Sequence, residues 1–451
     1  CLMKKVVIIG GVAGGASCAA RLRRMDETAE IVLLERGPYI SYANCGLPYH
    51  VGDVIKSRDA LLLQTPKAMR EKYAVDVRVQ NEVVSIDREN KKVTVKRVDT
   101  GELYDESYDV LVLSTGSSPV RPPIPGIDSP KIQTLWTVPD TDRIRALVQQ
   151  GDVKTAAVIG GGFIGLEMAE NLKHAGIEVS IVEMLDQVMA PIDYEMAQIV
   201  HENIEQNNVA LYLGDGVSSF RDNGKDVEIK LKSGKTLSAD LVILSIGVRP
   251  NSELAREAGL ELNPRGGVMV DAYLRTSDPN IYAVGDVADV ADFNFNERTM
   301  VPLAGPANKQ GRIAADNIAG ASEMYEGTQG TSIAQVFDLS VAATGTNEKT
   351  LIKRGLEKGE DYETVIITQN SHAGYYPGAT PMILKLLFSA DGKKIYGAQI
   401  VGRDGVDKRI DTIATTMRLN GGVSDLAKLE LAYAPPYSSA KDPVNMAGFT
   451  A

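Results

Sequence analysis

Cys45 is the residue of this sequence whose type and surroundings best suit redox chemistry. It lies in the segment SYANCGLPY, where its neighbours are small or polar and where a helix is expected to begin. Because a helix N-terminus lowers the pKa of a thiol, this setting predicts a thiolate capable of thiol–disulfide exchange. Cys18, by contrast, falls on the apolar face of an expected helix, where a free cysteine is usually a small buried hydrophobe.

The second of two glycine-rich loops has the complete dinucleotide-binding pattern. Residues 160–165 read GGGFIG, which gives G-x-G-x-x-G between an expected strand and an expected helix. The glycines permit a tight turn and a close approach to a pyrophosphate, and the helix N-terminus supplies free N–H groups. Glu183, 18 residues after Gly165, can accept hydrogen bonds from a ribose and repels a 2′-phosphate, so NADH is favoured and NADPH is the alternative. The cofactor-binding residues expected in this part of the chain are Gly160, Gly162, Phe163, Ile164, Gly165, Glu183 and Gly247.

The first glycine-rich loop departs from this pattern at one position. Residues 10–15 read GGVAGG, so the first and last glycines are in place while Val12 occupies the middle one. Glu35, 20 residues after Gly15, supplies the acidic residue that the pattern requires downstream. Two dinucleotide sites on one chain indicate two dinucleotides that exchange electrons.

Two further segments resemble the flavin motifs of flavoproteins that have two dinucleotide-binding domains. They are residues 114–116 (STG) and 276–286 (TSDPNIYAVGD). The resemblance implies that the first domain binds FAD and that Gly285 and Asp286 hold its ribityl and pyrophosphate part, whereas a helix cap would be the alternative role of such an aspartate. The residues expected to bind FAD are Gly10, Gly15, Glu35, Arg36, Thr115, Gly116, Gly285, Asp286, Pro302 and Ala304.

The segment around Cys45 resembles those of coenzyme A-disulfide reductases and of the related NADH-dependent persulfide reductases. The resemblance covers essentially the whole chain, including residues 372–382 (HAGYYPGATPM) and 431–448 (LAYAPPYSSAKDPVNMAG). Related two-cysteine disulfide reductases carry a second cysteine five residues after the first, where this sequence has His50. Cys45 is therefore expected to act alone, through a mixed disulfide, a persulfide or a sulfenic acid.

The same resemblance implies where a coenzyme A substrate would bind. Ser17, Arg21 and Arg24 share one face of the first expected helix, and arginines suit phosphate groups, although a solvated basic face is the plain alternative. In the family these positions contact the ADP part of coenzyme A. Tyr73 stands where one relative has a lysine. The other substrate contacts that the resemblance implies are Ser41, Asn44, Tyr73, Asn308 and Lys441.

Two tyrosines match residues that, in the family, reach the catalytic cysteine of the partner subunit. They are Tyr375 and Tyr433, and a phenol can protonate or hydrogen-bond a leaving thiolate. Packing is the alternative role of interface tyrosines. The resemblance thus implies a homodimer in which each active site draws on both copies.

The elements that must position these residues form a repeated pattern. A strand, a helix and a strand are expected at 4–10, 14–25 and 31–35, and again at 156–160, 162–175 and 178–183. Antiparallel strands are expected at 75–79, 83–86 and 92–98, and a helix at about 405–420 follows the strands of an α+β C-terminal part. We therefore predict an α/β protein with two Rossmann-like domains, glutathione-reductase-like, and an α+β dimerisation domain. The predicted boundaries are 1–119 with 250–325 for FAD, 120–249 for NAD(P)H and 326–451 for dimerisation.

Composition narrows the remaining possibilities. The net charge of −11 argues against a nucleic-acid binder, and the longest apolar runs, such as 110–113, are too short for a membrane span. Four histidines without paired cysteines argue against a metal site. The sparse cysteines and the lack of a signal segment predict a cytoplasmic protein. Cys1 and Leu2 precede Met3, and we expect them to be an addition ahead of the natural start.

Together these patterns predict a flavoenzyme that passes electrons from NADH, or NADPH, through FAD to Cys45. The substrate that the resemblance implies is a coenzyme A disulfide, persulfide or polysulfide, with coenzyme A as a substrate or as an adduct on Cys45. An NADH oxidase or peroxidase that cycles Cys45 through sulfenic acid is one alternative, but those relatives carry a histidine where this chain has Ala13. A flavin redox sensor without turnover is the other, and the complete NADH site argues against it.

Overall fold

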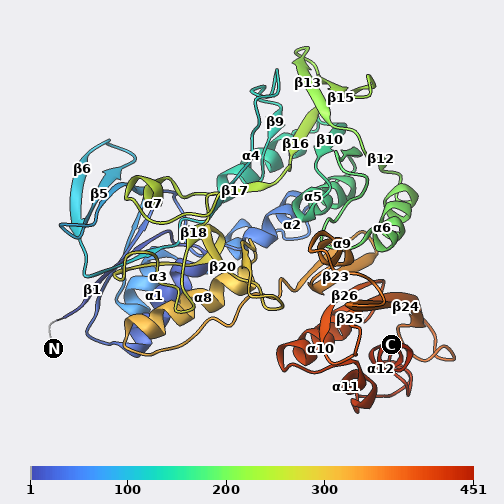
Figure 1. The fold of residues 1–451 in the computed structure, drawn as a ribbon. Helices are drawn as coiled ribbons and strands as arrows, with labels where there is room; N and C mark the ends of the chain where they lie inside the picture. Colours follow the sequence, from blue (N-terminus) through green and yellow to red (C-terminus); the bar gives the residue numbers. More distant parts are fainter. Residues whose placement is uncertain (1–2) are drawn as a thin grey trace.

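The computed structural model describes residues 3–451, so the expectation for Cys1 lies outside the described residues. Figure 1 shows two domains built on central sheets and a C-terminal domain drawn in orange and red. The prediction of an α/β protein with two dinucleotide-binding domains and an α+β C-terminal domain is confirmed. The exact domain boundaries stay a prediction.

The first domain is built on a five-stranded parallel sheet in the order β19-β7-β1-β2-β3. Its strands are continuous apolar runs, as expected where helices cover both faces of a parallel sheet. The edge strand β19 follows the second domain in the sequence, whereas the other four strands precede that domain. Two stretches that are far apart in sequence therefore form one sheet. The strands are β1 Lys5–Ile9, β2 Glu30–Glu35, β3 Asp76–Val79, β7 Val110–Leu113 and β19 Ile281–Ala283.

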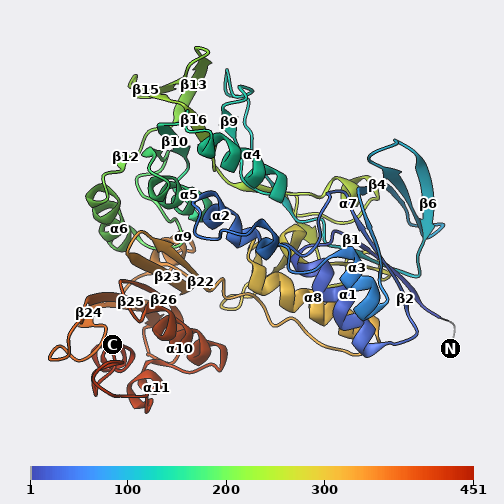
Figure 2. The ribbon, with the colours of Figure 1, turned by 180° about the vertical axis from the view of Figure 1, so that it is seen from behind.

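Helices α1 (Ala13–Met25) and α8 (Ala304–Ile318) lie side by side beneath this sheet in both views (Figures 1 and 2). Glycine makes their close approach possible, because a Cβ atom on Gly311 would stand 2.3 Å from the carbonyl oxygen of Gly14. This contact brings the expected residues of α1 next to those of α8.

The second domain repeats the arrangement with a parallel sheet in the order β12-β11-β10-β16-β9. Its helices α4 and α5 also pack against α2 (Leu47–Val51), the helix that directly follows Cys45. The elements are β9 Ile132–Gln133, α4 Val138–Gln149, β10 Thr155–Ile159, α5 Phe163–His174, β11 Glu178–Val182, α6 Tyr194–Gln206, β12 Ala210–Tyr212 and β16 Leu241–Leu244. A two-stranded ribbon of β8 (Ser117–Pro119) and β17 (Val248–Pro250) joins the two domains where the chain leaves and returns.

Each of these domains also carries a three-stranded antiparallel sheet, and here one expectation was wrong. Residues 76–79 form β3 of the main parallel sheet, because this strand pairs with the edge of β2, so it is not part of the meander. The first small sheet consists of β4 Asn81–Asp87, β5 Lys92–Arg97 and β6 Leu103–Ser107. The second consists of β13 Val217–Asp222, β14 Val227–Leu231 and β15 Thr236–Ala239.

The C-terminal domain packs an antiparallel sheet, in the order β22-β23-β26-β25-β24, against its helices. The expected helix at 405–420 is present as α10. The elements are β22 Ser332–Val336, β23 Leu339–Gly345, α9 Glu348–Lys353, β24 Tyr362–Asn370, β25 Pro381–Ser389, β26 Ile395–Gly402, α10 Val406–Arg418, α11 Val423–Lys428 and α12 Pro443–Thr450.

A buried lysine fastens the C-terminal domain to the second domain. Lys385 of β25 is only 1% exposed, and its ammonium lies 3.0 Å from Asp193, 2.6 Å from Glu348 and against Glu195. Burial alone would lower the pKa of Lys385, but the hydrogen bonds that its ammonium donates to the three carboxylates raise it, so the lysine stays charged. The three carboxylates could otherwise hold a metal ion, and the ammonium occupies that position.

Replacing Lys385 by methionine should destabilise the protein by about 3–5 kcal/mol, because buried Asp193 would keep its charge without a cation. Urea unfolding monitored by circular dichroism measures this loss. The matched control is Lys393→Met, since the Lys393 side chain is 85% exposed. Equal unfolding midpoints for the two variants would show that the buried ion pairs do not hold the domains together.

Candidate active site

The first glycine-rich loop has the shape of a dinucleotide cradle. A Cβ atom on Gly10 (φ +100°) would lie 2.0 Å from the carbonyl oxygen of Ser114, and one on Gly15 would lie 1.8 Å from that of Gly10. Only glycine therefore fits at both positions. The middle residue, Val12, is tolerated as the residue that precedes α1.

The second loop has the same construction with a more open centre. A Cβ atom on Gly160 would stand 2.1 Å from the carbonyl oxygen of Ser245, and one on Gly165 would stand 2.1 Å from that of Gly160. Around Gly162, apart from its two neighbours in the sequence, no heavy atom of the described residues lies within 4 Å of such a position. This leaves room for a pyrophosphate to approach the backbone at the start of α5.

The two acidic residues downstream of the loops occupy matching positions. Glu35 accepts hydrogen bonds from the amides of Gly11 (2.9 Å) and Gly37 (2.7 Å). Glu183 accepts them from the amides of Gly161 (2.7 Å) and Leu185 (2.8 Å). Each carboxylate oxygen keeps a free lone pair, so both can still accept a ribose hydroxyl.

The other residues expected to bind FAD gather at the carboxyl ends of β7 and β19. Asp286 accepts a hydrogen bond from Ser117 (2.6 Å), and burial raises the pKa of the Asp286 carboxyl. The Thr115 hydroxyl donates to the backbone oxygen of Asn251 (2.6 Å). This edge, with the first loop, fits the pyrophosphate and ribityl parts of an FAD. The remaining expected cofactor residues lie at element ends: Arg36 after β2, Gly116 before β8, Gly247 before β17, Pro302 and Ala304 at the start of α8, and Phe163 and Ile164 at the start of α5.

Cys45 lies in a short 3₁₀ turn, Asn44–Gly46, directly before α2 (Leu47–Val51). The turn is tied to the first glycine-rich loop, since the amide of Ser41 donates to the carbonyl oxygen of Gly11 (2.8 Å). Ser41 adopts a left-handed conformation (φ +43°), which strains a non-glycine backbone. The thiol is thereby held beside the expected flavin cradle and is exposed in the single chain.

The electrostatic setting of Cys45 differs from the one we expected from the sequence. Partial burial raises the pKa of the Cys45 thiol, and the nearby carboxyls of Glu167 and Asp286 raise it further. The five-residue helix α2 therefore does not lower this pKa on balance. Glu167 is a residue that the sequence analysis missed.

Glu167 and Glu170 lie three positions apart on α5, directly after the second glycine-rich loop. Burial raises the pKa of each to about 7, and for Glu167 the charge of Glu170 adds to the effect. The backbone of Phe337 in the C-terminal domain acts in the opposite direction and lowers the pKa of Glu170. The sequence feature that could have indicated these two glutamates is their spacing of three residues on a helix whose apolar face must be buried.

The segment that follows Cys45 is anchored on the second domain. Helix α2 packs against α4 and α5. Arg145 of α4 donates to the backbone oxygen of His50 and to Asp53 (2.7 Å). Arg58 forms a two-pronged ion pair with Asp142 (2.8 and 2.7 Å). His50, which stands where a second cysteine would be, is itself buried and bonded to the carbonyl oxygen of Ile55 (2.6 Å).

The structure brings most of the expected substrate residues together on the face formed by α1, α8 and α3 (Pro66–Tyr73). Ser17 bonds Asn308 (2.5 Å), and Arg24 bonds the Tyr73 hydroxyl (3.2 Å) with its guanidinium 5.5 Å from the ring centre. Arg21 is engaged by Asp316 (2.6 Å), so Arg24 is the arginine better able to meet a phosphate. Ser41 and Asn44 lie instead beside Cys45.

Tyr375, Tyr433 and Lys441 are placed elsewhere. All three are exposed and belong to the C-terminal domain, whose helix α10 lies well apart from α2 in both views (Figures 1 and 2). The two phenols share a hydrogen bond of 2.8 Å, which raises the pKa of the Tyr375 hydroxyl. Within one chain this pair is not brought to Cys45.

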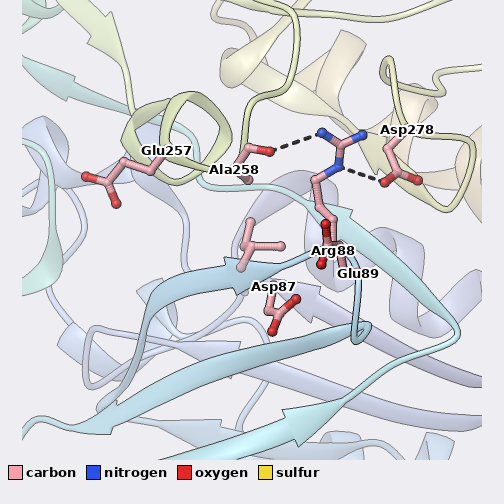
Figure 3. Close-up of a pocket in the computed structure, with 7 residues that line it drawn as sticks. Asp87, Arg88, Glu89, Glu257, Ala258 and Asp278 are labelled. Carbon is pink, nitrogen blue, oxygen red and sulfur yellow. Dashed lines mark hydrogen bonds and ion pairs between the residues drawn. The ribbon is translucent and has the colours of Figure 1, made fainter.

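A separate hollow of 670 Å³ on the first domain carries no comparable chemistry. Figure 3 shows that the Arg88 guanidinium crosses it to Asp278 (2.9 Å) and to the backbone oxygen of Ala258 (3.1 Å). The remaining charged residues of its wall are acidic, namely Asp87, Glu89 and Glu257. Since the arginine is already paired, we assign the residues of this hollow a structural role: Arg88 connects the first small sheet with the segments that carry Ala258 and Asp278.

Replacing Glu167 by glutamine should lower the pKa of Cys45, because it removes one of the negative charges that oppose the thiolate. The rate of alkylation by iodoacetamide against pH measures this pKa, and the curve should move to lower pH. Glu89→Gln, an exposed position in the turn between β4 and β5, is the control. Coincident curves for all three proteins would show that Glu167 does not act on the thiol.

Comparison with known proteins agrees with this geometry. Residues 4–311 match the family described as pyridine nucleotide-disulphide oxidoreductase, and residues 331–443 match its dimerisation domain. A coenzyme A disulfide reductase of Staphylococcus epidermidis is 36% identical over 450 residues, covering 100% of both chains. No helix among residues 3–451 has the length and apolar character needed to cross a membrane.

Solved structures are similar along almost the whole chain. Reduced CoADR-RHD of Bacillus anthracis has a TM-score of 0.97 at 55% identity, covering 99% of this chain and 80% of that one. An NAD-dependent persulfide reductase from A. fulgidus gives 0.95 at 38%, with coverages of 99% and 82%. A water-forming NADH oxidase from Lactobacillus brevis gives 0.94 at 27%, with coverages of 99% and 98%. The chain therefore belongs to the pyridine nucleotide-disulphide oxidoreductase family.

Proposed function

We propose that this protein is an FAD-dependent reductase that uses NADH to reduce a coenzyme A disulfide or persulfide through Cys45. One observation carries the proposal: a free thiol lies on a segment that is hydrogen-bonded to the loop of a dinucleotide cradle, and the carboxyl of Asp286 in that cradle raises the pKa of the thiol. The names of the similar proteins from Staphylococcus epidermidis and Bacillus anthracis support the choice of substrate.

The chemistry requires one attacking sulfur and one source of electrons. When bound, FAD would accept a hydride from NADH and make two electrons available next to the thiol. The Cys45 thiolate attacks one sulfur of the disulfide, which breaks the S–S bond, forms a mixed disulfide on Cys45 and releases one coenzyme A thiolate. Two electrons and a proton then release the second thiol and restore Cys45.

The Cys45 thiolate must be available at the working pH for this attack. The raised pKa of the thiol means that its neutral form is favoured in the chain alone, so reactivity should increase as the pH rises towards that pKa. Protonation of Glu167 near pH 7 removes one opposing charge. The pKa of Cys45 is therefore raised more when Glu167 is ionised than when Glu167 is protonated.

The proposal includes a homodimer. Tyr375 is 76% exposed and Tyr433 is 48% exposed in the single chain, and they belong to a domain that matches a dimerisation domain. Placed against Cys45 of a second copy, their shared hydrogen bond would offer a phenol proton to the leaving thiolate. Lys441, exposed in the same domain, would reach the same substrate.

The proposed binding face for the coenzyme A nucleotide is the one formed by Ser17, Arg24, Tyr73 and Asn308. An arginine meets phosphate oxygens with two parallel donors, and the Tyr73 ring fixes its guanidinium. Glu183, already held by two backbone amides, would repel the 2′-phosphate of NADPH. NADH is therefore the proposed electron donor.

The likeness to a water-forming NADH oxidase favours a second candidate, in which Cys45 cycles through sulfenic acid. Ala13, the first residue of α1, has no side-chain group that could assist peroxide chemistry at the thiol. The two candidates differ in what consumes NADH, because an oxidase consumes oxygen without any coenzyme A compound.

Replacing Cys45 by serine should abolish NADH-dependent reduction of coenzyme A disulfide, by on the order of 10³-fold or more, because serine cannot form the mixed disulfide. Reduction of the flavin by NADH in stopped flow should persist. Cys18→Ser, in the buried face of α1, is the matched control. Full disulfide turnover in Cys45→Ser would refute the proposal, and rapid oxygen uptake by the unaltered protein would favour the oxidase.

Replacing Arg24 by alanine should raise the KM for coenzyme A disulfide by about tenfold or more, because one charge-assisted hydrogen bond to a phosphate is lost. The KM for NADH should not change. Steady-state kinetics with both substrates measures the two constants, with Lys393→Ala as the surface control. An unchanged KM for the disulfide would show that the α1 face does not bind the substrate.

A further inference from the structure

Arg409 of α10 is a charged side chain for which the proposed mechanism has no use, and it is only 1% exposed. Its guanidinium forms an ion pair with Asp442 (3.0 Å), which is also buried. It donates further to the carbonyl oxygens of Ser371 (2.9 Å), Gly405 (3.1 Å) and Tyr437 (3.3 Å). All of these acceptors belong to the C-terminal domain, which also carries the exposed residues Tyr375 and Tyr433.

The partners of Arg409 belong to two loops that are far apart in sequence. Residues 371–380, between β24 and β25, form the first loop and carry Tyr375. Residues 429–442, between α11 and α12, form the second loop and carry Tyr433. Arg409 therefore forms hydrogen bonds with Ser371 of the first loop and with Tyr437 and Asp442 of the second loop.

Further hydrogen bonds join the two loops around this arginine. The amide of Ala373 donates to the carbonyl oxygens of Ser438 (3.1 Å) and Pro435 (3.3 Å). The Ser438 hydroxyl donates to Asp442 (2.6 Å) and lies 3.3 Å from the guanidinium. With the two loops joined in this way, the exposed hydroxyls of Tyr375 and Tyr433 form a hydrogen bond of 2.8 Å.

A lysine could not replace this arginine without loss. The guanidinium presents several N–H donors in a rigid plane, which here serve a carboxylate and three carbonyl oxygens at once. Asp442 is held from its other side too, because it caps α12 through the amide of Val444 (2.9 Å). Removing the cation would leave Asp442 buried and charged, so the second loop would have to move.

We propose that Arg409 is a positioning residue for the Tyr375–Tyr433 pair, which it holds as a preformed hydrogen-bonded unit before substrate arrives. Arg409 touches no reacting atom and acts through the two loops alone. The inference rests on the proposed function in one respect, namely that the tyrosines assist the sulfur chemistry at Cys45 of a second copy.

The kinetic test uses the full-length, FAD-loaded protein with Arg409→Met and the conservative Arg409→Lys. Stopped flow should show reduction of the flavin by NADH unchanged, while the step with coenzyme A disulfide slows by about tenfold or more. Lys393→Met is the control, since the Lys393 side chain lies in the same domain, is 85% exposed and is paired only with Asp391 in the described structure, outside both loops.

A double-mutant cycle separates positioning from general destabilisation. In a background with Tyr375→Phe and Tyr433→Phe, Arg409→Met should slow the sulfur step by less than about twofold, because the groups through which it acts are already gone. An equal slowing in both backgrounds, or slowing that only follows loss of dimer in light scattering, would overturn the inference. If Arg409→Met does not fold, Arg409→Lys gives the same comparison.

A structural readout keeps the inference testable even if the tyrosines prove to have no role in the reaction. In protein labelled with 3-fluorotyrosine, the ¹⁹F resonances of Tyr375 and Tyr433 should move in Arg409→Met and Arg409→Lys but not in Lys393→Met. If the double phenylalanine variant keeps the parental rate while these resonances move, the proposed function of the tyrosines fails and the positioning role stands. Unmoved resonances would overturn the positioning role itself.

Discussion

The seating of the Cys45 segment between two domains is the constraint on which the rest of the structure depends. On one side the strained backbone at Ser41 is bonded to the first glycine-rich loop. On the other side α2 rests on α4 and α5 and is fastened through Arg145 and Arg58. A redox thiol has to be held at a fixed distance from its electron source, and two rigid parallel sheets supply that frame.

Local patterns were sufficient to predict the parts of the fold that are set by local geometry. Positions 10 and 160 must be glycine, because a Cβ atom there would lie about 2 Å from a backbone oxygen. The glycine pattern of such a loop can therefore be recognised in the sequence alone. Residues 76–79 show the limit of such patterns. Their alternation fits either a meander or the edge of a parallel sheet, and only the free edge of β2 decides between them.

The candidate site was harder to predict where charge and tertiary contact decide the chemistry. The position of Cys45 before a helix suggested a lowered pKa, whereas burial with Glu167 and Asp286 raises it. Glu167 comes from the second domain, which no local pattern connects with Cys45. Likewise, the 2.8 Å contact of Tyr375 with Tyr433 depends on two loops whose meeting only the folded C-terminal domain reveals. The roles assigned to individual site residues stay predictions.

The most direct test of the proposed role of Cys45 is intact and peptide mass spectrometry of the FAD-loaded protein after reaction with coenzyme A disulfide. One coenzyme A adduct per chain is expected on the peptide that contains Cys45, and addition of NADH should release it as free thiol. Absence of the adduct, an adduct on Cys18, or an adduct that NADH does not release would contradict it.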